Sequence, residues 1–271
     1  FNPINSAIAG KVVDVLFSTM YEISFQPVGM KPSNFTQFFP YQPANVGDSI
    51  FGSNALVILT RDGRSITYHE TGLLTSPSLD LSPRRTLFGD MSFAAIGAQG
   101  GVGTAAANFK TEGSSAWAWA GYNEATIYQD LYSAAYGSSP YAAMSALDGF
   151  QIEAQVDTSE IESDDQGISD IVVGSVSYMG KFIPSSLTAA EIDTMCALQG
   201  ASASVPGTRM ESATDLVITP DNTGVTTTLK NALPSVGGQV HSVSTHQHQA
   251  IEFRAGAKNT TGTPDALITW A

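Results

Sequence analysis

The chain has 271 residues, of which 42% are hydrophobic, enough to fill a sizeable core in one large β domain or two small ones. Only 14% of the residues are charged, and the formal net charge is -13 because 25 acidic residues outnumber 12 basic ones. This balance excludes a broad basic surface for nucleic acid, and the sparse charge favours a subunit whose surface is covered by its neighbours.

The first half of the chain is predicted to contain strands on either side of a proline-rich loop. Residues 1–10 are expected to be irregular, and a run of β-branched and aromatic residues predicts strand structure over 11–25. Four prolines between Pro27 and Pro43 exclude a regular ladder in that segment. The phenylalanines of this loop therefore need a surface to pack on, either the domain itself or a neighbouring molecule.

A β-hairpin is predicted immediately after this loop. The segments 49–60 and 65–71 are rich in β-branched residues, and Asp62-Gly63 between them is a typical hairpin turn. Further on, Trp117 and Trp119 alternate with alanines, which suits a strand that presents both indoles on one face.

Two short helices are predicted in the second half of the chain. Apolar residues recur at helical spacing over 124–136, and Gly137 follows as a plausible cap. The second helix is predicted over 187–198, since Thr188 and Glu191 have the spacing of a capping box. The single cysteine, Cys196, lies on the apolar face of this helix. It excludes an internal disulfide framework and is interpreted as a small buried residue.

The remaining predicted elements are strands, and they define the expected fold class. Their ranges are 151–156, 168–182, 215–219, 225–229, 240–253 and 266–270. Roughly eight to ten strands joined by Gly and Pro turns predict a mainly β protein, an antiparallel two-sheet sandwich. The jelly roll is the sandwich that also accommodates long loops with helices, so we expect one jelly-roll domain over 1–271.

The sharpest local pattern is His246-Gln247-His248 followed by Glu252. On a strand, His246, His248 and Glu252 project to the same face, where two imidazoles and a carboxylate can bind a divalent metal. The pattern resembles the first half of the cupin metal motif, His-x-His-x3-Glu, which implies a metalloprotein. The flanking glycines of that motif are displaced here, and no histidine follows position 248. The alternative is that these are polar residues on a half-exposed or interface strand.

An acidic segment, 157–170, is predicted to be a loop between two strands. Carboxylates in a loop are ligands for calcium, which would suit an interface between subunits. A solvated charged loop is the alternative, because the EF-hand spacing is not met. The acidic residues are Asp157, Glu160, Glu162, Asp164, Asp165 and Asp170.

In length, strand count, loop helices, Ala/Ser/Thr/Gly content and Pro/Phe-rich loops, the chain resembles the jelly-roll coat proteins of small, picorna-like positive-strand RNA viruses. Both ends also look cut, since the chain begins at Phe1 and stops inside a predicted strand. The resemblance implies a structural capsid subunit located in the virion. Such a subunit assembles with copies or sister subunits to enclose the genome and performs no catalysis. The acidity of the chain implies little direct contact with nucleic acid.

Two other functions are compatible with the sequence. One is the cupin-like metalloprotein that uses His246, His248 and Glu252. The other is a β-sandwich binding module of a phage or extracellular appendage, for which Trp117 and Trp119 would supply an aromatic platform. No apolar run approaches the roughly 18 residues of a membrane-spanning helix, so none is predicted.

Overall fold

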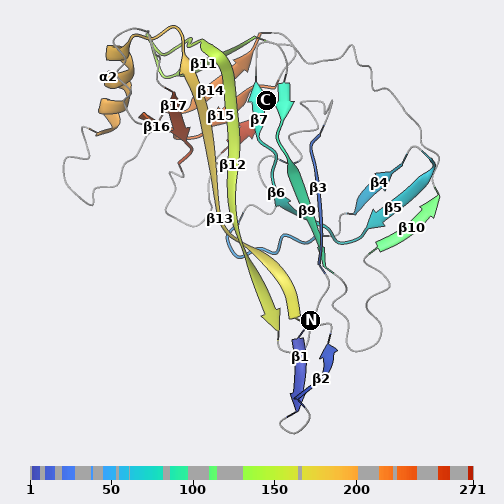
Figure 1. Cartoon of the computed structure of the whole chain (residues 1–271). Helices are drawn as coiled ribbons and strands as arrows, with labels where there is room; N and C mark the ends of the chain where they lie inside the picture. The colour runs from blue at the N-terminus through green and yellow to red at the C-terminus, as the bar shows by residue number, and fades with distance from the viewer. Residues whose placement is uncertain are drawn as a thin grey trace.

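The computed structural model describes residues 2–6, 10–15, 20–27, 38, 45–52, 55–60, 62–81, 86–96, 110–114, 131–163, 167–200, 214–221, 225–236, 250–256 and 268–270. Within these ranges the protein is mainly β, with five antiparallel sheets and one short helix, α2 (Ala189–Gly200) (Figure 1). The expected fold class is therefore confirmed at the level of a mainly β, antiparallel protein.

Two sheets make up the larger part of the described structure. The six-stranded sheet has the order β16 (Leu233–Val236), β17 (Ile251–Arg254), β13 (Gly167–Pro184), β12 (Ala146–Ser163), β7 (Leu79–Leu81) and β8 (Thr86–Phe88). The four-stranded sheet has the order β11 (Tyr132–Tyr136), β14 (Leu216–Pro220), β15 (Thr227–Leu229) and β18 (Ile268–Trp270). Buried side chains from both sheets and from α2 belong to one hydrophobic core, which we call the first core.

Aromatic side chains occupy the centre of the first core. The rings of Phe182 and Phe253 are stacked with their centroids 5.8 Å apart, and Tyr136 meets Phe253 edge-on at 5.1 Å. The Tyr136 hydroxyl donates a hydrogen bond of 3.0 Å to the Ala232 carbonyl, so its polar atom is satisfied although the residue is buried. The contact between Tyr136 of β11 and Phe253 of β17 therefore packs the four-stranded sheet against the six-stranded one.

Three smaller sheets lie outside this pair. They are β1 (Asn2–Ser6) with β2 (Gly10–Val15); β10 (Lys110–Ser114), β5 (Arg64–Tyr68) and β4 (Leu56–Leu59); and β3 (Met20–Phe25), β9 (Met91–Ile96) and β6 (Gly72–Thr75). A second core joins the last of these sheets to β13. Its buried members are Ile50, Leu73, Met91, Ala94, Ile171 and Val173.

The hairpin of β12 and β13 links the two cores. Its strands pair from Ala146↔Pro184 to Ser163↔Gly167, so the ribbon runs from the first core past the second (Figure 1). A short segment, Asn45–Phe51, is fastened to the β13 side of this ribbon. The Ile50 N–H donates to the Ile171 carbonyl at 2.9 Å, and the Ser49 hydroxyl donates to the Asp170 carboxylate at 2.6 Å.

The predicted hairpin and the predicted second helix are both confirmed. β4 and β5 pair in the register Leu56↔Tyr68 to Leu59↔Ser65, and Gly63 adopts a positive φ of 85° in the turn between them. The helix α2 begins directly after Thr188 with the expected capping box. The Glu191 N–H donates to the Thr188 hydroxyl at 3.3 Å, and the Glu191 carboxylate accepts a hydrogen bond from the Thr188 N–H at 2.8 Å.

Three of the predicted local structures are wrong. Residues 2–6, expected to be irregular, form β1 because they pair with β2. The end of the predicted helix 124–136 is strand β11, which pairs with β14, and the residues before 131 lie outside the described ranges. The acidic segment 157–170 is not a loop: residues 157–163 and 167–170 are paired strand, and only 164–166 lie outside the described residues.

Little of the proline-rich loop is described. Phe38 packs edge-on against Phe93, with ring centroids 6.2 Å apart, and its carbonyl accepts a hydrogen bond from the Ser76 hydroxyl at 3.0 Å. One aromatic of this loop therefore packs on the domain itself, and the remainder of the loop between residues 28 and 44 lies outside the described ranges.

Candidate functional site

The predicted metal ligands are only partly described. Glu252 lies on β17, and its carboxylate forms an ion pair of 3.4 Å with Lys181 on the adjacent strand β13. His246 and His248 lie outside the described residues, as does most of the predicted strand 240–253. Among the residues that are described, no three His, Cys, Asp or Glu side chains are grouped to hold a metal ion. The metal site therefore stays a prediction, and the one ligand that can be placed already has a cationic partner.

The acidic residues expected to share a calcium loop are distributed along two strands. Asp157 accepts a hydrogen bond of 2.6 Å from the Ser175 hydroxyl across the hairpin, whereas Asp170 accepts from Ser49 and from the Ile171 N–H. Glu160 and Glu162 follow on β12 with exposed side chains. Asp164 and Asp165 lie outside the described residues, so a calcium site at the end of the hairpin stays a prediction.

The predicted aromatic platform cannot be placed, because Trp117 and Trp119 lie outside the described residues. The third tryptophan, Trp270, lies on β18 and packs against the first core. Its role in the described part of the chain is therefore structural.

A groove opens where the chain that precedes β7 moves away from β12. β7 pairs with β12 only over Leu79–Leu81, and Leu79 lies opposite Ile152. The chain on the N-terminal side of Leu79 contains Pro77, which has no N–H to donate to a ladder. The Ser78 carbonyl instead accepts a hydrogen bond of 2.8 Å from the Gly89 N–H, and β6 pairs with β9 rather than with β12.

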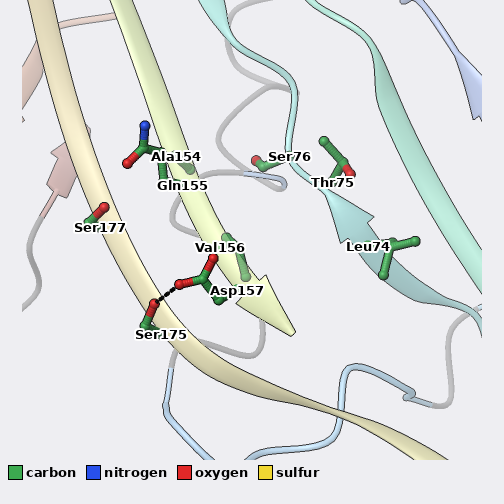
Figure 2. A pocket seen from close by; sticks show the side chains of 9 residues that line it. All are labelled: Leu74, Thr75, Ser76, Ala154, Gln155, Val156, Asp157, Ser175 and Ser177. Carbon is green, nitrogen blue, oxygen red and sulfur yellow. Dashed lines mark hydrogen bonds between the residues drawn. The ribbon is translucent and has the colours of Figure 1, made fainter. Parts of the chain in front are cut away.

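This separation leaves a cavity of about 380 Å³ between β6 and the long hairpin (Figure 2). One wall is Leu74–Ser76, and the other is Ala154–Asp157 of β12 with Ser175 and Ser177 of β13. Successive side chains of a strand point to opposite faces. A cavity bordered by four consecutive residues of β12 therefore runs along the edge of that strand, where backbone N–H and C=O groups point outward.

Polar side chains line the hairpin wall of the groove. In the hairpin register, Gln155 lies opposite Ser177 and Asp157 lies opposite Ser175, so these four side chains share one face. Figure 2 shows them on the ribbon, with Thr75 and Leu74 on the facing strand. Among the described lining residues there is one carboxylate, that of Asp157, and no lysine or arginine. The groove therefore presents hydrogen-bonding groups and one negative charge.

Two side chains at α2 have shifted pKa values for structural reasons. Hydrogen bonds from the Thr188 N–H and hydroxyl lower the pKa of Glu191. Burial, followed by the nearby Glu191 and Cys196, raises the pKa of Tyr141, whose hydroxyl donates to the Glu191 carbonyl at 2.9 Å. Both groups are used in fixing the helix, and neither lines the groove.

Sequence reasoning missed the groove because it depends on strand pairing between distant segments. Pro77 has no N–H to donate to a ladder, but a proline does not identify the strand from which the chain separates. The fold and groove together define a mainly β protein with an open sheet edge beside a polar cavity. No protein-family model matches the chain, and no curated protein sequence matches it. In the described part of the chain no helix is both long enough and apolar enough to span a membrane.

Proposed function

We propose that the chain is a structural subunit of an icosahedral viral capsid, which assembles with copies or sister subunits and has no catalytic activity. The observation that carries the proposal concerns two of the three small sheets, β10-β5-β4 and β3-β9-β6. Their outer strands β4 and β3 expose apolar side chains. An exposed apolar edge strand is a template for pairing with another chain, and free monomers usually protect such edges with charges or proline.

The edge strand β4 is the clearest case. Its sequence is Leu-Val-Ile-Leu, and among the described residues it pairs with β5 alone. The side chains of Val57 and Leu59 are 51% and 38% exposed, and the strand contains neither a charge nor a proline. A neighbouring subunit that covers this edge would remove the apolar surface from water.

The edge strand β3 supports the same reading. It pairs with β9 alone among the described residues, and Met20, Tyr21 and Phe25 all belong to its exposed large side chains. Tyr21 also contacts Tyr68 of β5, with ring centroids 6.3 Å apart, so the two small sheets lie beside each other. Their exposed edges can therefore belong to one interface, and a specific interface buries on the order of 800 Å² per partner.

The jelly roll is the narrower form of this proposal. The two larger sheets and their shared core support it, since a jelly roll consists of two packed antiparallel sheets. Within the six-stranded sheet, β12 and β13 form a hairpin, whereas β13 also pairs with β17 and β12 with β7, although these strands are far apart in the sequence. A Greek key likewise returns by a long connection to lie beside an earlier strand. A virion location and little direct contact with the genome follow from the proposed role and the acidic charge.

The alternatives receive no specific observation from the described residues. Glu252 is paired with Lys181 and is thus not placed as a free ligand for a cupin-like metal site. The tryptophans that would form the platform of a binding module lie outside the described ranges. We therefore keep the capsid subunit as the one proposed function.

The proposal is tested by measuring the mass and shape of what the purified chain forms. Light scattering after size exclusion, over a concentration series, is expected to show oligomers, and negative-stain electron microscopy is expected to show closed particles or their fragments. A stable monomer at the highest concentration, alone or with a sister subunit, contradicts the proposal. Fibres in place of closed particles would contradict it as well.

A further inference from the structure

The groove between β6 and β12 is a place where the sheet lacks a strand. Among the described residues, β12 pairs with β13 without a gap from Phe150 to Ser163, apart from register shifts, but on its other edge it pairs with β7 only at residues 150–152. β6 pairs with β9 on one edge, and its other edge has a single bridge, from Gly72 to Phe51. Two strand edges thus border the groove without a partner strand between them in the described structure.

The dimensions of the groove suit an extended polypeptide. A strand advances about 3.3 Å per residue, so the four residues Ala154–Asp157 offer a ladder of about 13 Å. The cavity of about 380 Å³ is within the size range of ligand sites. Peptides that add a strand to a sheet edge gain affinity from backbone hydrogen bonds and specificity from alternate side chains.

The charges around the groove select a basic occupant. The Asp157 carboxylate lines the groove, Glu160 and Glu162 follow it on β12 with exposed side chains, and none of the lining residues that the structure describes is a lysine or arginine. A second copy of this chain would bring a net charge of -13 to this acidic place, whereas a basic segment of a different protein is attracted to it.

We propose that the groove binds an extended, basic segment of another protein as an added strand between β12 and β6, with a lysine or arginine beside Asp157. Of the two carboxylate oxygens of Asp157, Oδ2 accepts the Ser175 hydroxyl, which fixes the side chain over the groove. Gln155, Ser177 and Thr75 offer further hydrogen-bonding groups to the occupant. This site is independent of the apolar edges β3 and β4 on which the capsid proposal depends.

The test uses the full chain and three fluorescent peptides of alternating threonine and valine. One peptide has a central lysine, the second has glutamate at that position, and the third is the lysine peptide N-methylated on alternate residues. Fluorescence anisotropy at low salt is expected to show saturable binding of the lysine peptide and roughly tenfold weaker binding of the glutamate peptide. The N-methylated peptide should not bind, because its methyl groups remove the hydrogen-bond donors along one edge of the added strand and block that edge from pairing.

Variants of the chain locate the binding. Asp157→Asn is expected to weaken binding of the lysine peptide by about threefold, the size of one exposed charge pair. Thr75→Lys combined with Gln155→Lys should abolish binding, because it places two ammonium groups in the groove. Asp148→Asn is the control, since Asp148 is an exposed aspartate on the same strand outside the groove and should leave binding unchanged.

Several outcomes would overturn this assignment. They are no binding at millimolar peptide, equal binding of the lysine and glutamate peptides, or equal binding of the N-methylated peptide, which would indicate attraction without strand addition. Release of subunits from an oligomer by the lysine peptide would show that a second copy is the natural occupant, which also contradicts the proposal. None of these results depends on whether closed particles form, so the two proposals can fail separately.

Discussion

Thr188 and Glu191 determine how the helix α2 begins. Each satisfies a group of the other: the Glu191 N–H donates to the Thr188 hydroxyl, and the Glu191 carboxylate accepts from the Thr188 N–H. The first N–H groups of a helix have no partner within the helix. This reciprocal pair supplies hydrogen-bond acceptors for two N–H groups at the start of α2. The helix then places Ile192 and Met195 in the first core.

Replacing the capping threonine is expected to destabilise the protein. Thr188→Ala should lower the free energy of unfolding by about 1 kcal/mol, the usual cost of losing such a cap. Urea denaturation followed by circular dichroism measures this. Thr194→Ala, at an exposed position inside the same helix, is the control and should be neutral or slightly stabilising because alanine is the best helix former. Equal losses from both variants would contradict a capping role.

The lowered pKa of Glu191 predicts a pH dependence. A carboxyl group whose pKa is lower in the folded state stabilises the fold at pH values above its unfolded pKa, near 4.5. That contribution is lost as the pH falls through the lower folded-state value. The melting temperature of the native chain should therefore exceed that of Glu191→Gln at pH 7, and the difference should shrink below pH 4. A difference that stays constant over this range would contradict the assignment.

The residues that were predicted correctly carry local signals. Asp62-Gly63 predicted a turn because glycine adopts the positive φ that the turn needs, and Thr188 with Glu191 predicted a helix start from spacing alone. Glu252 shows the limit of such reasoning. Its spacing from His248 suggested a metal ligand, but its actual neighbour is Lys181 on β13, a strand that lies far away in the sequence.

Among the elements, β13 depends on a glycine where the two larger sheets approach each other. A Cβ atom added at Gly180 would lie 2.7 Å from Leu229 Cδ1 and 3.4 Å from Leu216 Cδ2. Both leucines belong to the four-stranded sheet and are fully buried. The absence of a side chain at Gly180 therefore permits this sheet to pack closely on β13.

Gly180→Ala is expected to destabilise the fold by about 1–3 kcal/mol, because the leucines must shift in a core that is already filled. Gly174→Ala is a control on the same strand: the position is exposed, and an added Cβ would have ordinary contacts, the nearest at 3.4 Å to the Asp157 carbonyl. It should be neutral or slightly stabilising, since alanine loses less backbone entropy on folding. Thermal denaturation of both variants measures the difference. Equal melting temperatures of the two variants would contradict close packing of the leucines on Gly180.

The elements that were predicted wrongly are those whose form depends on a distant partner. The period of apolar residues over 124–136 favours a helix, but Tyr132–Tyr136 pairs with Leu216–Pro220, and this tertiary pairing overrides the local preference. The acidic segment 157–170 is likewise predicted from its own sequence to be a loop, and it forms paired strands instead. In a two-stranded ribbon, however, charged side chains can face water on exposed positions while Ile171 and Val173 of the partner strand enter the second core.

For the whole molecule, assembly through exposed edges predicts the effect of a single charge. Val57→Lys places an ammonium group on the β4 edge, which should raise the concentration at which oligomers form by about tenfold and leave the monomer fold intact. Light scattering measures the first effect and circular dichroism the second. Thr219→Lys, on an exposed position of β14, is the matched control and should assemble like the native chain. If both variants assemble equally well, the β4 edge is not an interface.

The long ribbon of β12 and β13 also has a mechanical consequence. Ala154 packs against the first core, Val156 and Ile168 pack against the second, and Val176 packs against both. Because one ladder joins these positions, a displacement of the ribbon in one core would also displace side chains in the other.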